Sequence, residues 1–410
     1  MVMLMGITVV LSYAQQGAST GINSPYTRFG FGRLSDQRLS ATRAMGGTAY
    51  ALRDGSYVNT ANPASYSAVD SLTFLFDAGM SLHYSHFDDN GVKTNVQNGH
   101  FDYVAMQFRL RPGLGFTAAL LPFSRVGYNF TQTDELQQGF AATNIHSGTG
   151  SLQQLMAGIG WMPLRNLSVG ANVSYLYGDL KHSVTNKFNN PDASSSAWFR
   201  KISVSDYRLD FGAQYSYNID KRRVITLGAT LSPGHDLGAK DYYTKANIGA
   251  GDKMETTDTI TGFRLPTMIG AGISYIKDNR LTLAADYSFQ KWGACKFDGR
   301  DGLLTDRHVL SLGAEFKPDA MSRNYLKRIR YRAGVRVASS YMKVNGVDGP
   351  KEYGVVAGFG LPMWNSKSIL NISGEYLREK ASGNMLKTDY FRVNVGLTFN
   401  ERWFMKWRVN

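Results

Sequence analysis

Apolar and polar residues alternate along most of the chain after Ser71. From Phe74 to Tyr84 the apolar side chains occupy the even-numbered positions, and mostly polar side chains occupy the positions between them. The same two-residue period recurs at residues 206–217 and 391–399. Successive side chains of a β-strand point to opposite faces of a sheet, so this period predicts strands with one apolar and one polar face.

Segments with this period follow one another through the rest of the chain, separated by turns rich in Gly, Asn, Asp and Pro. Short connections at 163–165 and 278–279 contrast with longer ones at 181–199, 233–256 and 293–305. We predict about 14 strands, at residues 72–86, 100–111, 113–131, 149–162, 166–180, 200–219, 222–232, 257–277, 279–292, 306–317, 327–343, 352–362, 367–379 and 388–399.

Two kinds of structure show such alternation: a soluble β-sandwich and a membrane barrel with a polar lumen. Each predicted strand with its connection takes roughly 23 residues, which suits strands of about 9–11 residues that cross a bilayer. No run of 18 apolar residues follows the N-terminal segment, so helical membrane spans are excluded. Aromatic residues near predicted strand ends are typical of lipid-interface girdles: Tyr84, Phe123, Trp161, Tyr175, Tyr177, Tyr217, Trp292, Tyr376 and Tyr390.

The sequence therefore predicts an all-β fold, an antiparallel transmembrane β-barrel of about 14 strands formed by residues 71–400. In such barrels the short turns face the periplasm and the long loops face outward, so both chain ends are expected in the periplasm. Outer-membrane lipid is then the expected surroundings of the apolar faces.

The two ends of the chain carry separate signals. Residues 3–11 are apolar, and the small residues Ser12 and Ala14 follow at −3 and −1 of a cleavage after Ala14, which predicts a signal peptide at residues 1–14 and export to the outer membrane. Residues 401–410 form a basic aromatic tail on the periplasmic side. Its side chains Trp403, Phe404 and Trp407 are either contacts for a partner or anchors in the membrane interface.

Composition is consistent with a barrel. The 410 residues are 43% hydrophobic, 12% aromatic and 19% charged, and mean hydropathy is only −0.26 because the lipid-facing and lumen-facing residues cancel. The net charge is +13, but no run of five or more Lys or Arg occurs, so no nucleic-acid partner is expected.

Motifs for catalysis and metal binding are missing from the sequence. Its seven histidines form no zinc-binding pair with a glutamate, and Cys295 stands alone. No nucleophile elbow and no phosphate-binding loop occur. We therefore predict no enzymatic activity, no cofactor and no metal site.

Residues 15–70 do not alternate and are too short for a core of their own, so they are expected to fold inside the barrel as a plug. The segment is rich in arginine, and the predicted lumen face carries charges of both signs. These charges either hold the plug through ion pairs or line a hydrated passage. The candidate lumen residues are Asp206, Arg208, Asp210, Asp286, Arg328, Arg330, Arg332 and Arg336, with Asp77, Glu315, Glu375 and Arg392.

The plug also carries the motifs of a known family. Gly46-Gly47 is followed by Asn62-Pro63-Ala64 ahead of the first strand, and Leu265-Pro266 and Asp286 follow in order. This arrangement resembles the outer-membrane long-chain fatty-acid transporters of the FadL type, in which such a segment forms a plug, or hatch, inside the barrel. Here Gly46, Gly47, Asn62, Pro63 and Ala64 are expected to shape the plug turn or to lie near a ligand. The arginine-rich opening of the plug departs from that family.

Two functions remain open from the sequence. The resemblance implies passive transport of a hydrophobic or amphipathic small molecule across the outer membrane. No continuous apolar lining can be traced on the predicted lumen face, however. The alternative is a non-transporting accessory barrel that docks periplasmic or outer-membrane proteins in an assembly or secretion complex.

Overall fold

The computed structural model describes residues 24–71, 73–89, 92–135, 141–189, 194–248, 253–258, 262–363, 367–380 and 386–402. The predicted signal peptide, residues 1–14, and the tail side chains Trp403, Phe404 and Trp407 lie outside these ranges. Within them, no helix is long and apolar enough to cross a membrane.

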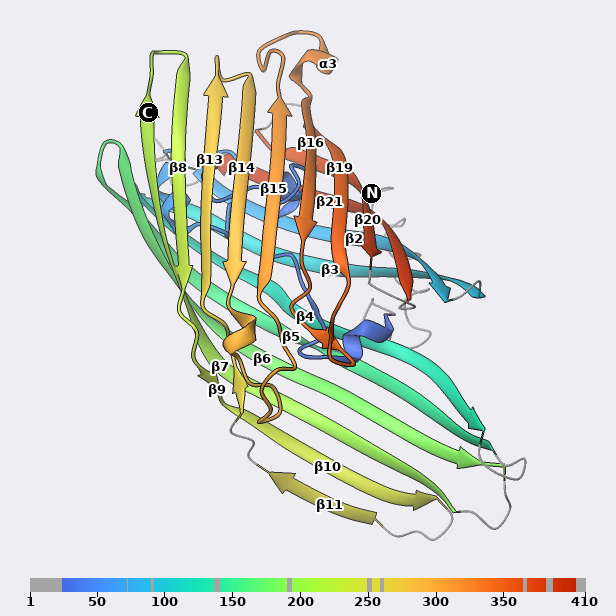
Figure 1. Ribbon diagram of the computed structural model, residues 1–410. Helices are drawn as coiled ribbons and strands as arrows, with labels where there is room; N and C mark the ends of the chain where they lie inside the picture. Colours follow the sequence, from blue (N-terminus) through green and yellow to red (C-terminus); the bar gives the residue numbers. More distant parts are fainter. Residues whose placement is uncertain are drawn as a thin grey trace, which may run out of the picture.

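Fourteen antiparallel strands form a closed barrel, which confirms the predicted fold class (Figure 1). Each strand pairs with the next, and the last pairs with the first, from Thr73 opposite Arg402 to Asp88 opposite Lys387. The barrel strands are β2 (Thr73–Asp89), β3 (Val92–Arg111), β4 (Leu114–Glu135), β5 (Ala141–Leu164), β6 (Leu167–Phe188), β7 (Ser195–Asn218), β8 (Arg223–Ser232), β13 (Met268–Lys277), β14 (Leu281–Gln290), β15 (Arg307–Phe316), β16 (Arg330–Ala338), β19 (Lys351–Pro362), β20 (Ile369–Lys380) and β21 (Lys387–Arg402).

The two faces of the barrel wall differ as the alternation predicts. On β2, Met80 and Leu82 are more than half exposed on the outside, whereas Asp77 and Ser81 are buried inside. Six of the predicted girdle aromatics are exposed, but Phe123, Trp292 and Tyr390 are buried. Phe123 lies where the pairing of β4 with β5 shifts by one residue, so its side chain joins the interior. Tyr390 lies on the inner face of β21, and Trp292 lies beyond the end of β14.

Strand length divides the barrel into two parts. The strands β4 to β7 are 22 to 24 residues long, whereas β8, β13, β14 and β15 have 10 residues each. Only about 9–11 residues are needed to cross a bilayer. The long strands therefore continue well past the membrane at one end, which we call the loop end; the other is the turn end.

Three predicted elements differ from the structure. Residues 181–199 are mostly strand, because their polar side chains are compatible with a sheet in water. Residues 257–277 are not one strand, since Leu265-Pro266 interrupts them between β12 (Phe263–Arg264) and β13. Arg328 lies in the short helix α3 (Tyr325–Arg328), which Asn324 caps, and not on a strand.

Shorter elements complete the loop end. A hairpin of β10 (Ala239–Ile248) and β11 (Lys253–Asp258) continues the sheet beside β7. The two-residue strands β9 (Asp236–Leu237) and β12 pair with each other. The remaining elements are η5 (Trp292–Ala294), β17 (Lys343–Val344) and β18 (Val347–Asp348).

The N-terminal segment, drawn in blue in Figure 1, lies inside the barrel. It contains η2 (Pro25–Arg28), β1 (Arg33–Leu34), α2 (Ser40–Arg43) and η3 (Pro63–Ala68), and most of its residues from Ser40 to Ser67 are buried. We call residues 24–70 the plug. Its apolar side chains Leu39, Val58 and Val69 pack against the inner wall of β2 to β5.

One seam in the wall is only partly hydrogen-bonded. Strands β3 and β4 pair from Val104 to Arg111 of β3, and beyond that point they diverge toward the right of Figure 1. Plug strand β1 pairs with β4 there, placing Arg33 opposite Arg125 and Leu34 opposite Ser124. The plug thus takes the place that β3 leaves along this edge of β4.

Candidate functional site: the plug and the inner wall

The plug touches the wall through glycines on the inner face. At each of twelve wall glycines on ten strands, an added Cβ would lie between 2.0 and 3.0 Å from a plug atom. Real Cβ atoms are not found at such distances, so the two surfaces are in direct contact on ten of the fourteen strands. These wall glycines are Gly115, Gly158, Gly160, Gly170, Gly212, Gly228, Gly270, Gly272, Gly313, Gly334, Gly358 and Gly396, on β4, β5, β6, β7, β8, β13, β15, β16, β19 and β21.

The Asn62-Pro63-Ala64 motif anchors the plug to this wall. The buried Asn62 caps η3 by accepting the N–H of Ala64 at 3.1 Å, and Pro63 occupies the first helical turn. The Asn62 amide also donates to the carbonyl of Tyr50 at 2.7 Å and to that of Ala213, on β7, at 3.2 Å. The motif therefore makes contacts that fold and seat the plug.

The Gly46-Gly47 turn lies against β15 and β16. Both glycines have positive φ, +69° and +82°, which other residues rarely adopt. A Cβ on Gly46 would meet wall backbone at 2.8 Å. Just beyond the turn, the carboxylate of Asp286 on β14 accepts the N–H groups of Ala49 at 2.6 Å and Tyr50 at 2.8 Å. One lumen carboxylate thus holds two backbone groups of the plug.

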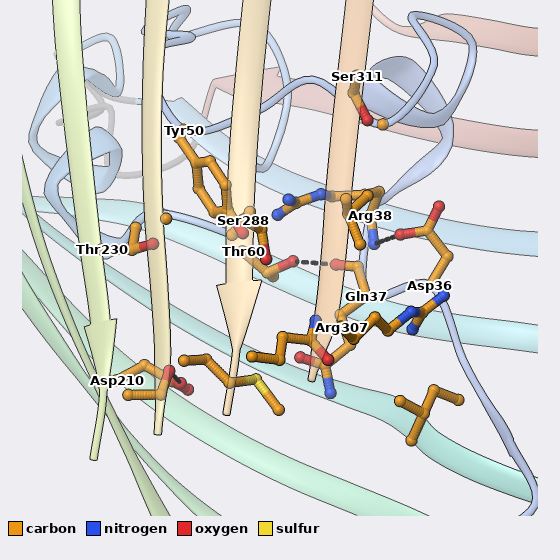
Figure 2. A pocket seen from close by; sticks show the side chains of 18 of the residues that line it. Asp36, Gln37, Arg38, Tyr50, Thr60, Asp210, Thr230, Ser288, Arg307 and Ser311 are labelled. Atoms are coloured by element: carbon orange, nitrogen blue, oxygen red, sulfur yellow. Dashed lines mark hydrogen bonds between the residues drawn. The ribbon is translucent and has the colours of Figure 1, made fainter. Parts of the chain in front are cut away.

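A cavity of about 130 Å³ remains between the plug and the wall. Figure 2 shows Asp36, Gln37 and Arg38 of the plug facing Asp210 and Thr230 of the wall across it. Most side chains around it are polar or charged, and Gly47 also lines it. Pockets for small organic ligands usually hold about 300–1,000 Å³ and are mainly apolar. This cavity suits a few water molecules better than a hydrophobic ligand.

Among the described residues, four ion pairs join plug charges to the wall strands, and they include Arg33 with Glu379 at 3.3 Å and Arg43 with Asp102. Arg336 lies 2.9 Å from Asp36, and Arg330 lies 3.5 Å from Asp54. Burial would raise the pKa of the Asp36 carboxyl, but the neighbouring guanidiniums, first that of Arg336, outweigh burial and hold this pKa below its usual range. The plug is therefore held by ion pairs as well as by close packing.

The other candidate lumen residues have different neighbours. Arg208 donates to Gln37 of the plug at 3.2 Å and pairs with Asp210 at 2.8 Å. Asp206 accepts the N–H of Gly238 and so holds the end of β9. Arg332 pairs with Glu315 at 2.7 Å within the wall. Arg328 lies over the ring of Tyr325 at the turn end, away from the lumen strands.

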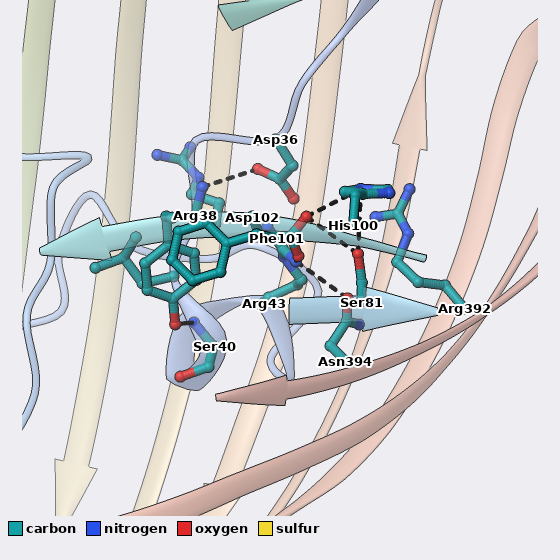
Figure 3. A network of polar contacts seen from close by, with 12 residues as sticks. Asp36, Arg38, Ser40, Arg43, Ser81, His100, Phe101, Asp102, Arg392 and Asn394 are labelled. Carbon is teal, nitrogen blue, oxygen red and sulfur yellow. Dashed lines mark hydrogen bonds and ion pairs between the residues drawn. The ribbon is translucent and has the colours of Figure 1, made fainter. Parts of the chain in front are cut away.

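A network around Asp102 was not foreseen from the sequence. Its carboxylate accepts from Arg43 of the plug, from Ser81 at 3.0 Å and lies 3.0 Å from His100 (Figure 3). Gly79 pairs with Tyr103 and Met80 with Phe101, so Asp102 is the extra residue of a β-bulge. A bulge shifts the inward-facing positions by one residue, and only the acidic residue between two aromatics could have signalled it.

The same network closes the partly paired seam. Arg125 of β4 donates to the carbonyl of Phe101 on β3 at 3.2 Å and lies 3.9 Å from Asp102. Arg43 also donates to Asn394 of β21 at 3.0 Å. Side chains therefore connect β3 and β4 where their backbone ladder ends.

Apolar side chains close the loop end of the lumen. Phe31 of the plug lies 5.8 Å from Trp292 and 5.1 Å from Phe297, measured between ring centroids, and all three are buried. The cluster reaches the cavity at Phe123. In the described ranges no group of three or more His, Cys, Asp or Glu is placed to hold a metal ion.

Comparisons with known proteins give one family and a set of similar folds. A family model described as BamG matches residues 1–410. No curated protein matches the chain. Among solved structures, the toluene transporter TodX of P. putida is 16% identical, with a TM-score of 0.64 and coverage of 90% of this chain and 100% of that one.

Two further structures have the same architecture. A FadL homologue of Pseudomonas aeruginosa is 12% identical, with a TM-score of 0.64 and coverage of 90% and 99%. The monoaromatic hydrocarbon channel CymD is 14% identical, with a TM-score of 0.61 and coverage of 89% and 98%. At such low identity the likeness to FadL-type proteins is one of fold, and the family match is to BamG.

Proposed function

We propose that this chain, which belongs to the BamG family, is a sealed outer-membrane barrel that docks partner proteins in an assembly or secretion complex. In this proposal the plug, residues 24–70, is a permanent part of the barrel, and the turn end faces the periplasm. The barrel offers surfaces to partners and conducts no small molecule.

The observation that carries the proposal is the fit of the plug to the inner wall. Glycines on ten of the strands leave no space for a single added carbon between wall and plug. A passage along this interface would need the plug to move away from the wall. That movement breaks the contacts of Asp286 with two backbone N–H groups and four ion pairs between plug and wall. Buried groups left without partners cost about 1–3 kcal/mol each.

The cavity and the loop end support the same conclusion. The space beside the plug is small and mostly polar, and the apolar cluster around Phe31 fills the loop end with side chains. A hydrophobic molecule would find no continuous apolar path between these two regions. Membership of the BamG family also favours protein partners over a small-molecule substrate.

Passive transport of a hydrophobic or amphipathic molecule is the second candidate. It is favoured by the seam, where β3 and β4 lack backbone pairing and only side chains and plug strand β1 close the wall. The fold is also that of TodX and CymD, which are described as a toluene transporter and a hydrocarbon channel. This function requires Arg125 and the plug to move.

Flux measurements separate the two candidates. The purified chain is reconstituted in liposomes, and uptake of toluene and of a fluorescent fatty-acid analogue is compared with protein-free liposomes. We expect no difference for the wild type. A double variant, Asp286→Ala with Arg336→Met, loosens the plug and serves as the control that the assay detects a leak. Uptake by the wild type above that of empty liposomes contradicts the proposal.

Docking is tested by extraction from the native membrane in a mild detergent. We expect partner proteins to remain with the chain in fixed stoichiometry through washing and size-exclusion chromatography. A variant that lacks residues 403–410, which follow the last paired residue of β21, tests whether the tail contributes. Recovery of a lone barrel, with a hydrophobic molecule bound in its interior, argues for transport instead.

A further inference from the structure

The turn end of the barrel carries one connection unlike its neighbours. Other connections at this end are two to six residues long, such as Pro112–Gly113 and Met363–Ser368, whereas residues 317–329 span the interval from β15 to β16 and include α3 (Figure 1). We call residues 317–329 the turn-end loop. It is well structured, since the Asn324 side chain accepts the N–H of Leu326 at 3.0 Å.

The turn-end loop is fixed to the rim of the barrel. The hydroxyl of Tyr325 donates to the carbonyl of Pro362, at the end of β19, at 3.1 Å. The hydroxyl of Tyr331 on β16 donates to the carbonyl of Leu326 at 3.0 Å. A rigid surface loses little conformational entropy when a partner binds, which favours tight docking.

This loop carries apolar side chains with large accessible areas. Met321 is 93% exposed, the highest value for a large apolar side chain among the described residues, and Leu326 is 62% exposed. Neither belongs to a strand that faces lipid. Clustered apolar side chains on a fixed, exposed loop are typical of contacts with another protein.

A cavity of about 570 Å³ opens beside the loop, lined by Met321, by the plug residues Arg53 to Gly55 and by basic side chains at its rim. The rim cations Arg280, Lys317 and Arg328 form no ion pair with a carboxylate in the described part of the chain. The Nε of Arg328 is buried and has no hydrogen-bond partner.

Three of the four carboxylates of this cavity are paired with arginines, which leaves, among the described residues, one unpaired carboxylate against the three unpaired rim cations. Asp54 pairs with Arg330, Glu315 with Arg332 and Asp278 with Arg222. Asp319 accepts the N–H of Met321 at 3.0 Å. The open mouth therefore has an excess of positive charge, which attracts an acidic partner.

We infer that the turn-end loop and this cavity form a docking surface for a periplasmic protein segment that presents an apolar side chain flanked by carboxylates. The apolar side chain packs on Met321 and Leu326, and the carboxylates pair with Lys317 and Arg328. This inference rests on the proposed docking function and names where one partner binds.

Lipid headgroups are a less suitable occupant. Phe316 is exposed on the lipid side of β15, so the next residue, Lys317, lies on the lumen side and lines the cavity. Plug residues form the floor of the same cavity. The unmatched cations thus surround an aqueous mouth that the surrounding bilayer does not enter.

Photo-crosslinking in the native membrane tests the inference. The photoreactive amino acid p-benzoylphenylalanine is placed at position 321 of the full chain, and at position 221 in the exposed turn between β7 and β8 as a control. We expect a discrete protein adduct from position 321 only, mapped by mass spectrometry to a segment with acidic residues. Adducts with phospholipid alone, or equal adducts from both positions, overturn the inference.

Charge reversal sharpens this test. With the crosslinker at position 321, the double variant Lys317→Glu with Arg328→Glu is expected to reduce the protein adduct by about tenfold, because opposite charges steer the partner. Lys221→Glu, an exposed change at the same end, is expected to leave it unchanged. An adduct that survives the charge reversal contradicts the inference. If partners still co-purify in that case, the docking function stands and only its position is wrong.

Discussion

The plug meets the barrel in two different ways. On six of the strands its backbone lies against wall glycines, with no side chain between them. Around Asp36 and Asp102 the contact is made by charged side chains, and space for water remains. Several polar atoms of the second region, including Nε of Arg43 and Nε of Arg336, have no hydrogen-bond partner among the described residues.

The two kinds of contact have different roles: glycine contacts close the lumen, and charged pairs position the plug. Backbone contact at a glycine tolerates no added atom, so it closes the lumen and fixes the distance between plug and wall. Charged pairs act over longer distances and determine which plug residue faces which strand. Substitutions in the two regions should therefore differ in the size and the pH dependence of their effects.

The largest effect is expected where the wall touches the plug backbone. A Cβ at Gly228 would lie 2.0 Å from the carbonyl oxygen of Tyr50. We expect Gly228→Ala to lower the free energy of unfolding by about 3 kcal/mol, the upper end for overpacking, because backbone must move. Gly374→Ala is the matched control, since nothing lies within 4 Å of its Cβ position. Chemical unfolding in detergent measures both, and equal stability of the two variants contradicts the seal.

A smaller loss of unfolding free energy is expected when the Asp286 carboxylate on β14 is removed. Asp286→Ala leaves the N–H groups of Ala49 and Tyr50 buried without a partner. The expected cost is roughly 1–3 kcal/mol. Asp286→Asn keeps one carbonyl acceptor and should recover part of it. The same unfolding assay applies, and a neutral Asp286→Ala would show that the plug turn is held elsewhere.

Breaking the ion pair between Arg336 and Asp36 should change the response to pH. The pKa of Asp36 is below its usual range in the folded protein. Its contribution to stability is therefore present above the unfolded value of about 3.9 and is lost as the pH falls through the lower, folded value. In Arg336→Met the main neighbouring cation is gone, so burial raises this pKa.

We expect Arg336→Met to cost about 1–2 kcal/mol near pH 7, because the pair is only partly shielded from solvent. Its stability should also fall less than that of the wild type when the pH is lowered from 7 to 3.5. If the free energies of unfolding of the two proteins fall by the same amount over this pH range, Asp36 and Arg336 do not interact.

The smallest effect is expected outside both contact regions. Arg328 lies over Tyr325 in the turn-end loop and forms no ion pair with a described carboxylate. Arg328→Met should change the unfolding free energy by no more than about 0.5 kcal/mol. A loss above about 1 kcal/mol would mean that this arginine stabilises the barrel.

The barrel itself could be predicted from the sequence, because lipid on one side and a polar lumen on the other force a two-residue period on every strand. The ends of β5, β6 and β7 could not, since beyond the membrane both faces of the sheet meet water and the apolar signal disappears. The interruption at Leu265-Pro266 could have been read from its proline, which cannot donate to a strand ladder.

The candidate site was predictable only in part. Asp286, Arg330 and Arg336 lie on lumen faces that alternation identifies, but their plug partners depend on how the plug folds. Asp102 lies on a β-bulge, which shifts the alternation by one residue. The pattern therefore does not mark its side chain as facing the lumen. The abundant glycines were evident in the sequence, yet their contact with the plug is a tertiary property that no local pattern encodes.

Hydrogen–deuterium exchange of the plug backbone tests most directly whether the plug is a fixed part of the wall. The measurement follows peptides that cover residues 39–52 and, for reference, peptides from β14 and β15, in the intact protein in detergent. A seated plug predicts exchange within about tenfold of these strands, because both open only in the same large unfolding event. Exchange of residues 39–52 within seconds, while the strands stay protected, would mean that the plug leaves its seat and would contradict the sealed barrel.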